Sequence, residues 1–258
     1  MLELEAGDAT VSVSPLHGGR VAQITVGETA LLKGAIGDHP MTWGSFPMAP
    51  WAGRIRHGTF TFDDRIHRLP RNLEPHAIHG SVFTHPWTVE DAGRDYCELS
   101  CPLDGPFGGF AHQHLQLDPD GLTCMLSVTA TRPMPVVIGW HPCFRKPLAA
   151  DLEFEVMLPR DHEGIPTGHE VAPTPHPWDD CFRSPVGPLR LHYPSLTVTL
   201  SSDCAWWVVY DEPDDATCVE PQSAPPDAVN LAMADVLDTG DLLQRHFRLA
   251  WQRSATHR

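Results

Sequence analysis

Short runs of alternating apolar and polar residues, separated by Gly, Pro, Asn and Asp, recur from one end of the chain to the other. A side-chain period of two is typical of strands with one buried face, and amphipathic helical periodicity is scarce. The pattern therefore predicts a mainly β protein. It contains no internal repeat, low-complexity tract or long linker, so we expect one continuous domain over residues 1–258.

Three pairs of runs flank turn residues and predict antiparallel hairpins. The turns are His17-Gly18-Gly19, Asp63-Asp64 and Asp118-Pro119-Asp120-Gly121, and the last is the strongest hairpin signal. The flanking runs are residues 11–14 with 21–26, 56–62 with 65–69, and 112–117 with 122–131. These hairpins favour a large antiparallel sheet structure.

Other segments are less regular. Residues 46–55 have too many prolines for a central strand and too few polar side chains for a solvated loop, so we expect an ordered wall. Prolines also make 159–188 loop-rich. The tail 242–251 fits either a short helix or a last strand, and we prefer a strand for residues 245–251. Further predicted strands are 87–103, 136–140, 152–158, 205–210 and 217–219.

Charge narrows the possible partners. The formal net charge of −15 argues against nucleic acid or an anionic membrane and favours a neutral ligand. The first residues lack the pattern of a signal peptide, and no apolar run approaches the ~20 residues of a membrane span. We therefore expect a cytoplasmic protein, whose oligomeric state the sequence leaves open.

Seven cysteines form no CxxC pair. Cys97 and Cys101 are close enough in sequence to share a metal or a bridge, but small buried thiols in a reducing cell are the simpler prediction.

Three polar residues share one local pattern, because His79, His141 and Glu220 each end an apolar run beside Gly or Pro. Pro221 also keeps the backbone of Glu220 out of the helical region. Side chains held in this way could divide acid and base roles in a concave site. The alternatives are a solvated carboxylate at Glu220 and, among sixteen histidines, ordinary core or surface rings.

Metal and cofactor motifs are weak or missing. His112 and His114 would place two rings on one strand face, but no third ligand at a recognisable spacing supports a metal site. The sequence has no GxSxG, Walker-type loop or GxGxxG, so we expect no cofactor. Four of the eight tryptophans lie near the polar candidates in the sequence, namely Trp43, Trp51, Trp140 and Trp178. Indole rings in such positions either stack on sugar rings or pack in the core, and the sequence leaves both alternatives open.

Taken together, these residues resemble the motifs of the aldose 1-epimerase (galactose mutarotase) family, in the same order along most of the chain. The five matching segments are Gly53-Arg54-Ile55 with Gly58-Thr59-Phe60 (family N-R-I-x-x-G-x-F), Ile78-His79-Gly80-Ser81 (L-H-G-G), His141-Pro142-Cys143-Phe144 (H-x-Y-F), Trp178-Asp179-Asp180-Cys181-Phe182 (Y-D-H-x-F), and Val219-Glu220-Pro221-Gln222 with Pro225-Pro226-Asp227-Ala228 (E-P-Q and P-D-A).

The resemblance implies a large antiparallel two-sheet β-sandwich of the galactose mutarotase type, with a sugar site in a cleft. It also implies an isomerase that interconverts hexose anomers without a cofactor or metal. Glu220 would accept the proton of the anomeric hydroxyl and His141 would protonate the ring oxygen. His79 would hydrogen-bond the ring region, Arg54 and Asp179 would hold hydroxyls, and Trp140 would contact the sugar.

Some positions depart from the family pattern and leave the substrate open. Gly53 replaces Asn, Ser81 replaces the second Gly, and His76-Ala77 replaces the Asn-His of galactose-specific members. One alternative is a sugar with an anionic group at C6, for which Arg54, Arg56, Arg71 and Arg145 are available cations. Another is a non-catalytic carbohydrate-binding protein with the same fold.

Overall fold

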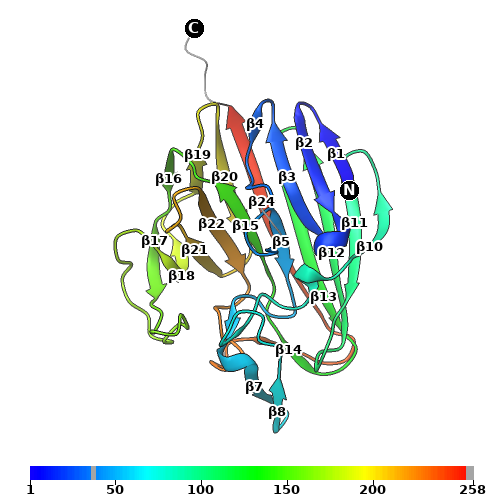
Figure 1. The fold of residues 1–258 in the computed structure, drawn as a ribbon, viewed down its shortest axis with the longest axis vertical. Coiled ribbons are helices and arrows are strands. Elements are labelled where there is room, and N and C mark those ends of the chain that lie inside the picture. The colour runs from blue at the N-terminus through cyan, green and yellow to red at the C-terminus, as the bar shows by residue number, and fades with distance from the viewer. Residues whose placement is uncertain (36–38, 254–258) are drawn as a thin grey trace.

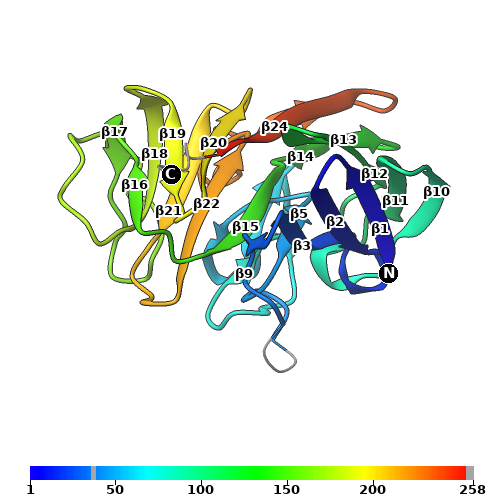
Figure 2. The same ribbon diagram turned by 90° about the horizontal axis from the view of Figure 1, so that it is seen from above.

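Two large antiparallel sheets pack face to face in the computed structural model, which describes residues 1–35 and 39–253 (Figures 1 and 2). In the view from above, β24 and β13 lie in one layer, and β3, β5 and β15 lie in the other (Figure 2). The prediction of an all-β, two-sheet sandwich is therefore confirmed.

The first sheet has ten strands and carries most of the residues that matter for the site. Its order is β1-β2-β3-β5-β15-β22-β21-β18-β17, with β4 paired to β3. The bounds are β1 Leu2–Ala6, β2 Ala9–Ser14, β3 Arg20–Val26, β4 Thr29–Ala30, β5 Ser45–Met48, β15 Gly139–Arg145, β17 Phe154–Leu158, β18 Asp179–Pro185, β21 Trp206–Tyr210 and β22 Ala216–Gln222.

The second sheet has eight strands in the order β10-β11-β12-β13-β24-β20-β19-β16. The long C-terminal strand lies in its middle, between strands from two different parts of the chain. The bounds are β10 Thr88–Ala92, β11 Tyr96–Pro102, β12 Gly109–Asp118, β13 Gly121–Ala130, β16 Ala149–Asp151, β19 Leu189–His192, β20 Leu196–Ser202 and β24 Leu242–Arg253.

Short elements connect the two layers at one end of the molecule. The β7–β8 hairpin projects from this end (Figure 1). The paired strands are β6 Arg54–Ile55 with β9 Ala77–Ile78, β7 Thr59–Phe62 with β8 Arg65–Arg68, and β14 Met134–Val136 with β23 Asp235–Leu237. The 3-10 turns are η1 Pro15–His17, η2 Arg56–Gly58 and η3 Val82–Thr84. None of the helices in the described ranges is long and apolar enough to cross a membrane.

The main core fills the space between the two sheets. Trp140 of the first sheet packs against Phe247 of the second, with ring centroids 5.8 Å apart. Alternating residues of long strands such as β12 and β24 enter this core, as the period of two requires. Residues that alternate with them on the ten-stranded sheet face outward, and several of these carry the candidate chemistry.

Local sequence patterns located most strands. All three predicted hairpins are present, and the tail forms β24, a strand as preferred above. The runs at 152–158 and 205–210 correspond to β17 and β21. The run at 87–103 divides into β10 and β11, because residues 93–95 form a turn.

Other boundaries were wrong. Residues 136–140 divide between β14 and β15, and β15 continues through His141. The loop-rich stretch contains β18, and the strand expected at 217–219 extends from Ala216 through Gln222. The sequence predicted that residues 46–55 hold no central strand, but β5 lies between β3 and β15. It pairs with β3 only through Val21 and Ser45, so Pro47 removes no hydrogen bond on that side.

Candidate active site

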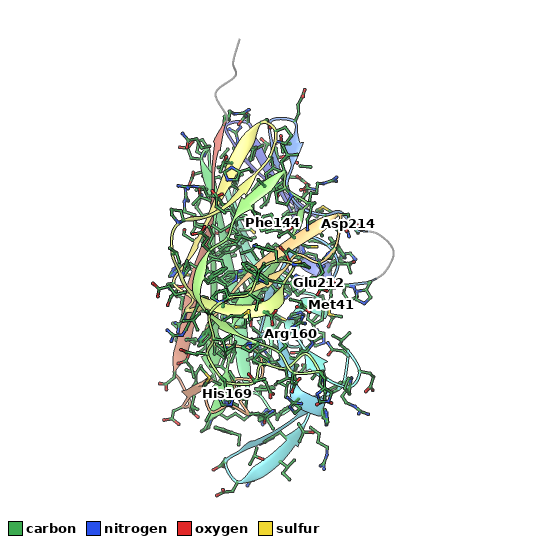
Figure 3. All side chains as sticks on the ribbon, turned by 90° about the vertical axis from the view of Figure 1, so that its left-hand side faces the viewer. Met41, Phe144, Arg160, His169, Glu212 and Asp214 are labelled. Atoms are coloured by element: carbon green, nitrogen blue, oxygen red, sulfur yellow. The ribbon has the colours of Figure 1, made fainter. Side chains whose placement is uncertain are left out.

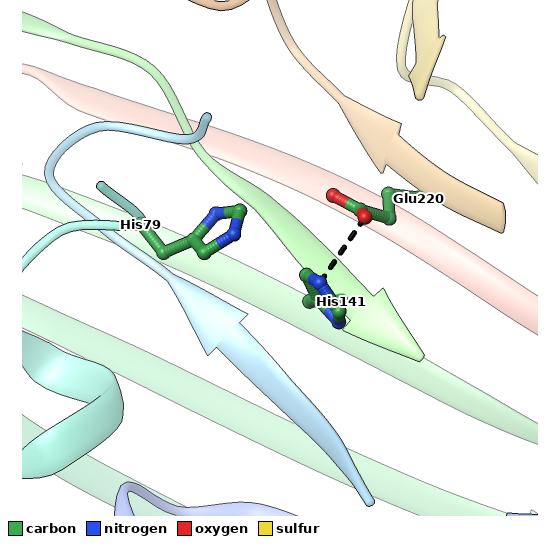
Figure 4. Close-up of side chains that lie close together, drawn as sticks. All are labelled: His79, His141 and Glu220. Carbon is green, nitrogen blue, oxygen red and sulfur yellow. Dashed lines mark ion pairs between the residues drawn. The ribbon is translucent and has the colours of Figure 1, made fainter. Parts of the chain in front are cut away.

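Glu220 and His141 lie opposite each other on adjacent central strands. β15 and β22 keep one register on both sides of them, since Gly139 pairs with Gln222 and Cys143 pairs with Cys218. His141 Nε2 lies 3.2 Å from Glu220 Oε1 (Figure 4). Both side chains are at least nine-tenths buried. The tertiary structure thus brings the two predicted catalytic groups into direct contact.

Trp140 occupies the other face of β15. Because side chains alternate along a strand, Trp140 points into the core while His141 points outward. Its side chain is 1% exposed and lies against Phe247. Trp140, which was predicted to contact the sugar, therefore does not line the cavity, and its indole supports the strand from behind.

His79 reaches the same place from the loop after β9. Its backbone has φ of 61°, and its N–H donates to the carbonyl of Gly53 at 2.9 Å. The His79 and His141 rings meet edge to face, with centroids 4.9 Å apart. Phe46, opposite His141 on β5, stacks on the His141 ring at 4.6 Å. Both imidazoles are therefore held by packing.

Arg54 and Asp179 form a polar group in the same cavity. Asp227 fixes the Arg54 segment, since its N–H donates to the Arg54 carbonyl and its carboxylate accepts the N–H of Arg56. Asp179, at the start of β18, accepts a hydrogen bond from Arg160 and lies 3.9 Å from the Arg54 guanidinium. Both residues were predicted to hold sugar hydroxyls, and both line the cavity.

The cavity opens on the outer side of the ten-stranded sheet and has a volume of about 360 Å³. Two residues that line the cavity are Met41 and Pro213. Figure 3 shows Met41 on this side of the sheet, together with Glu212 and Asp214, which flank Pro213 in the sequence. A ligand entering here meets one group of polar side chains, namely Lys33, Arg54, His79, His141, Asp179, Glu220 and Gln222.

Burial moves the proton equilibria of the central pair in opposite directions. Desolvation, followed by repulsion from Asp179, raises the pKa of Glu220 well above its usual value. Desolvation also lowers the pKa of His141 to about 4. Both shifts favour a neutral pair that holds one proton between the carboxyl and the imidazole. Such a pair can exchange a proton without creating a new buried charge.

His79 and Asp179 respond to burial in the same way. Desolvation, together with the nearby His141 and Arg54, lowers the pKa of His79 well below its usual value. Desolvation raises the pKa of Asp179, although Arg160 and Arg54 oppose the change. His79 is therefore a neutral ring at neutral pH, suited to hydrogen bonding.

Two cavity histidines present ring nitrogens with no partner. Within the part of the chain that the structure describes, His79 Nδ1, His141 Nδ1 and Gln222 Oε1 are buried and make no hydrogen bond. Buried polar atoms are normally satisfied, so unpaired ones in a cavity are available to a polar ligand. A polyhydroxylated molecule offers both donors and acceptors.

The two histidines and Glu220 are also close enough together to suggest a metal site. His79, His141 and Glu220 each offer one ligand atom, and these atoms lie within 4.8 Å of one another. A metal-bound histidine normally donates its second ring N–H to a protein group. His141 directs Nε2 toward Glu220 and leaves Nδ1 without such a partner. The arrangement fits a metal poorly and fits an acid–base pair better.

Gln222 is a residue of this site to which the sequence assigned no role. Its Nε2 donates to Glu220 Oε2 at 3.1 Å, and its side chain is fully buried. It lies two residues beyond Glu220 on β22 and hence on the same face. The two-residue spacing from Glu220 could have identified Gln222 from the sequence. It was missed because the predicted strand ended before Gln222.

Two of the positions that depart from the family motif have local explanations. Gly53 has φ of 66°, and a Cβ there would lie 2.6 Å from Pro226. His76 is buried away from the cavity; its Nδ1 accepts the N–H of His57, and its Nε2 lies 2.9 Å from the Glu163 carbonyl. These contacts make His76 a structural residue.

Other candidates lie elsewhere. Among the described residues, Arg54 is the one of the four proposed arginines that lines the cavity. Arg56 binds Asp161 and Glu163, and Arg71 pairs with Glu74. Trp43, Trp51 and Trp178 do not line the cavity, and His112 and His114 belong to no potential metal cluster in the described ranges.

Comparison with known sequences gives one family. The family model described as "Aldose 1-epimerase" matches residues 1–188, a stretch that contains Arg54, His79, His141 and Asp179 and ends before Glu220. The uncharacterized protein YphB of Escherichia coli strain K12 is 26% identical over 215 residues, covering 70% of this chain and 73% of that protein.

Solved structures share the fold at low sequence identity. A galactose mutarotase-like protein from Clostridium acetobutylicum superposes with a TM-score of 0.84 at 18% identity, covering 98% of this chain and 95% of that one. A galactose 1-epimerase from Lactobacillus acidophilus gives 0.82 at 16% identity, with coverages of 98% and 94%. A GalM/aldose epimerase homologue from C. elegans gives 0.85 at 16%, with 98% and 99%.

Proposed function

Because the chain belongs to the aldose 1-epimerase family, we propose that it interconverts the α and β anomers of a hexose by acid–base ring opening and closure. The observation that carries this proposal is the His141–Glu220 pair at 3.2 Å in the cavity. Opening a cyclic sugar requires removal of a proton from the anomeric hydroxyl and addition of one to the ring oxygen. Both oxygens are bonded to the same carbon, so the two groups must be neighbours.

The proton count of the pair suits this cycle. The cycle begins from the arrangement in which the shared proton lies on His141 and Glu220 is a carboxylate. Glu220 accepts the hydroxyl proton while His141 donates its proton to the ring oxygen, which leaves a neutral carboxylic acid and a neutral imidazole. After the aldehyde turns over, the acid returns its proton to the carbonyl oxygen and the imidazole recovers the other. Burial favours the neutral pair, so it stabilises the enzyme when the sugar is open.

The surrounding residues would orient the ring. In this proposal Arg54 and Asp179 hold hydroxyl groups, and neutral His79 hydrogen-bonds the region of the ring oxygen. Gln222 donates to the second oxygen of Glu220 and keeps the first directed at the substrate. Together these contacts supply the positioning on which proton transfer depends.

The charges in the cavity favour a neutral hexose over one with an anionic C6 group. Its two long-chain cations already have acidic partners, because Arg54 lies beside Asp179 and Lys33 pairs with Asp215 at 2.7 Å. A phosphate or carboxylate would compete with these acids. The convergence of two histidines and a carboxylate likewise favours catalysis over sugar binding alone.

Polarimetry tests the proposal directly. The purified protein should accelerate the return of fresh α-glucose or α-galactose to anomeric equilibrium, and Glu220→Gln should reduce kcat by about 10²–10⁴ because the base is lost. Glu98→Gln changes an exposed carboxylate of β11 and serves as the matched control, with activity retained.

Two results would contradict the proposal. Full activity in Glu220→Gln would remove this carboxylate from the mechanism. Saturable sugar binding without faster anomer exchange, across a panel of neutral and C6-charged aldoses, would identify a binding protein instead.

A further inference from the structure

Two cysteines lie on the floor of the cavity, two residues along the strands from the His141–Glu220 pair. Cys143 and Cys218 face each other across β15 and β22. They lie two residues from His141 and Glu220 respectively, and therefore project from the same face of the sheet. Both line the cavity and both are free thiols.

The register places these two cysteines at bonding distance. Directly opposed residues of antiparallel strands have Cα atoms about 4.5–5.5 Å apart, and disulfides span about 4.4–6.8 Å. Both side chains belong to one small buried cluster, in which Cys143 Sγ also donates to the Thr42 carbonyl at 3.4 Å. A disulfide would therefore need little backbone movement.

Two other pairs of cysteines, both in the eight-stranded sheet, are too far apart to bond. Cys97 and Cys124 are separated by Leu115 of the intervening strand β12, hence by about two strand spacings of 4.8 Å. Cys97 and Cys101 are four residues apart on one strand, about 13 Å along it. Neither pair can form a disulfide within the folded sheet.

The surroundings of the two opposed thiols give them different roles. A hydrogen bond from Cys218, assisted by the nearby Lys33 ammonium, lowers the pKa of Cys143 despite its burial. The pKa of Cys218 is raised well above its usual value by the same hydrogen bond and by desolvation. Burial raises the pKa of Cys97, Cys101 and Cys204 to about 12. Cys143 is thus the better nucleophile of the pair.

We propose that Cys143 and Cys218 form a dithiol modification site in the cavity floor, which peroxide converts to a cross-strand disulfide. The site rests on the register of β15 and β22 and is independent of the sugar reaction. Its ligand class is a small peroxide that can enter the cavity, with hydrogen peroxide as the simplest member.

The chemistry proceeds in two balanced steps. The Cys143 thiolate attacks one oxygen of hydrogen peroxide, the O–O bond breaks, and the departing hydroxide takes a proton to become water. Cys218 sulfur then attacks the resulting sulfenic acid at Cys143 sulfur; the S–S bond forms, the S–O bond breaks, and a second water leaves with the thiol proton. Two thiols are oxidised and one peroxide is reduced to two waters.

Mass spectrometry of the full chain tests the site. The reduced protein is treated with hydrogen peroxide, quenched, denatured and alkylated without reductant. We expect the number of alkylated cysteines to fall from seven to five, with the loss of two hydrogen atoms per chain. Peptide mapping should join the segments that contain Cys143 and Cys218, and a phosphine reductant should restore all seven thiols.

Variants separate the two roles. Cys218→Ser should leave Cys143 as a sulfenic acid that dimedone traps, whereas Cys143→Ser should give neither product. Cys97→Ala, which changes a buried cysteine of the other sheet, should retain the disulfide. Either of two results with the wild-type protein would overturn the proposal: seven alkylated thiols after peroxide treatment, or a disulfide that joins other cysteines. This test does not depend on whether the variants fold.

Discussion

At the scale of single residues, burial determines what each polar group of the cavity can do. Glu220, His141 and His79 are all buried, and for each of them desolvation is the largest influence on the pKa. Burial favours the uncharged form of acids and bases alike. Desolvation therefore favours the uncharged forms of all three side chains. The effect of these pKa shifts on the free energy of unfolding can be measured.

His79 should make folding sensitive to acid. Its folded pKa is lowered, so below about pH 6.5 the unfolded chain binds a proton that the folded chain does not, and stability falls as pH falls. His79→Asn should therefore reduce the slope of unfolding free energy against pH, by up to about 1.4 kcal/mol per pH unit.

Urea unfolding between pH 5 and 7 measures this slope. Asn tolerates the positive φ at position 79, so the variant should fold. His112→Asn, an exposed change on β12, is the control and should follow the wild type. Equal slopes for wild type and His79→Asn would show that the His79 ring is not kept neutral by the fold.

Gln222 should act as a positioning residue for Glu220. Its hydrogen bond favours the carboxylate, so Gln222→Met should raise the pKa of Glu220 further and shift the acidic limb of the kcat/KM profile to higher pH. We expect kcat at neutral pH to fall about tenfold. A lower rate with an unshifted pH profile would indicate a purely structural role. Gln116→Met, on the opposite sheet, is the control.

At the scale of elements, the site depends on how strands and loops meet. β15 and β22 present their alternate residues to the cavity, and the missing N–H groups of Pro142 and Pro221 interrupt the ladder beside the central pair. The loop after β9 brings His79 over these strands through the close approach of Gly80 to Ala49. That approach is the most restrictive contact of the loop.

Gly80→Ala should displace the loop that carries His79. Gly80 has φ of 79°, and an added Cβ would lie 1.9 Å from the Ala49 carbonyl oxygen. We expect a loss of about 1–3 kcal/mol in unfolding free energy, measured in urea, and a lower kcat in polarimetry.

Gly187→Ala is the matched control for this change. No atom lies within 4 Å of the position of its added Cβ, so stability and rate should stay near those of the wild type. A Gly80→Ala protein as stable and active as Gly187→Ala would contradict the contact between the loop and Ala49.

At the scale of the whole molecule, the space between the sheets supports the cavity from behind. Trp140 joins the two layers through Phe247, while its neighbour His141 faces the cavity. The same strand thus contributes to the core with one face and to the site with the other. This arrangement separates changes in stability from changes in sugar affinity.

Trp140→Phe should affect folding more than sugar binding. Removal of part of a fully buried ring should lower the free energy of unfolding by about 1–3 kcal/mol. KM for the preferred sugar should stay within about twofold, because no atom of Trp140 lines the cavity. Unchanged stability with a KM raised about tenfold would restore Trp140 as a sugar contact.

The sequence by itself determined the class of the fold and most of the candidate residues. The period of two, the turn residues at Asp118 to Gly121 and the ordered motifs depend on neighbours within a few positions, so they can be recognised in one chain. Arg54, His79, His141, Asp179 and Glu220 were found in this way. A single domain over residues 1–258 stays a prediction.

The tertiary structure decided which of these residues meet. Register between β15 and β22, strands separated by some seventy residues, places Glu220 against His141 and Cys143 against Cys218. It also turned Trp140 into the core and revealed Gln222, since a strand's two faces are assigned only once its partners and boundaries are known. Long-range pairing, which no local pattern encodes, therefore fixed the geometry of the site.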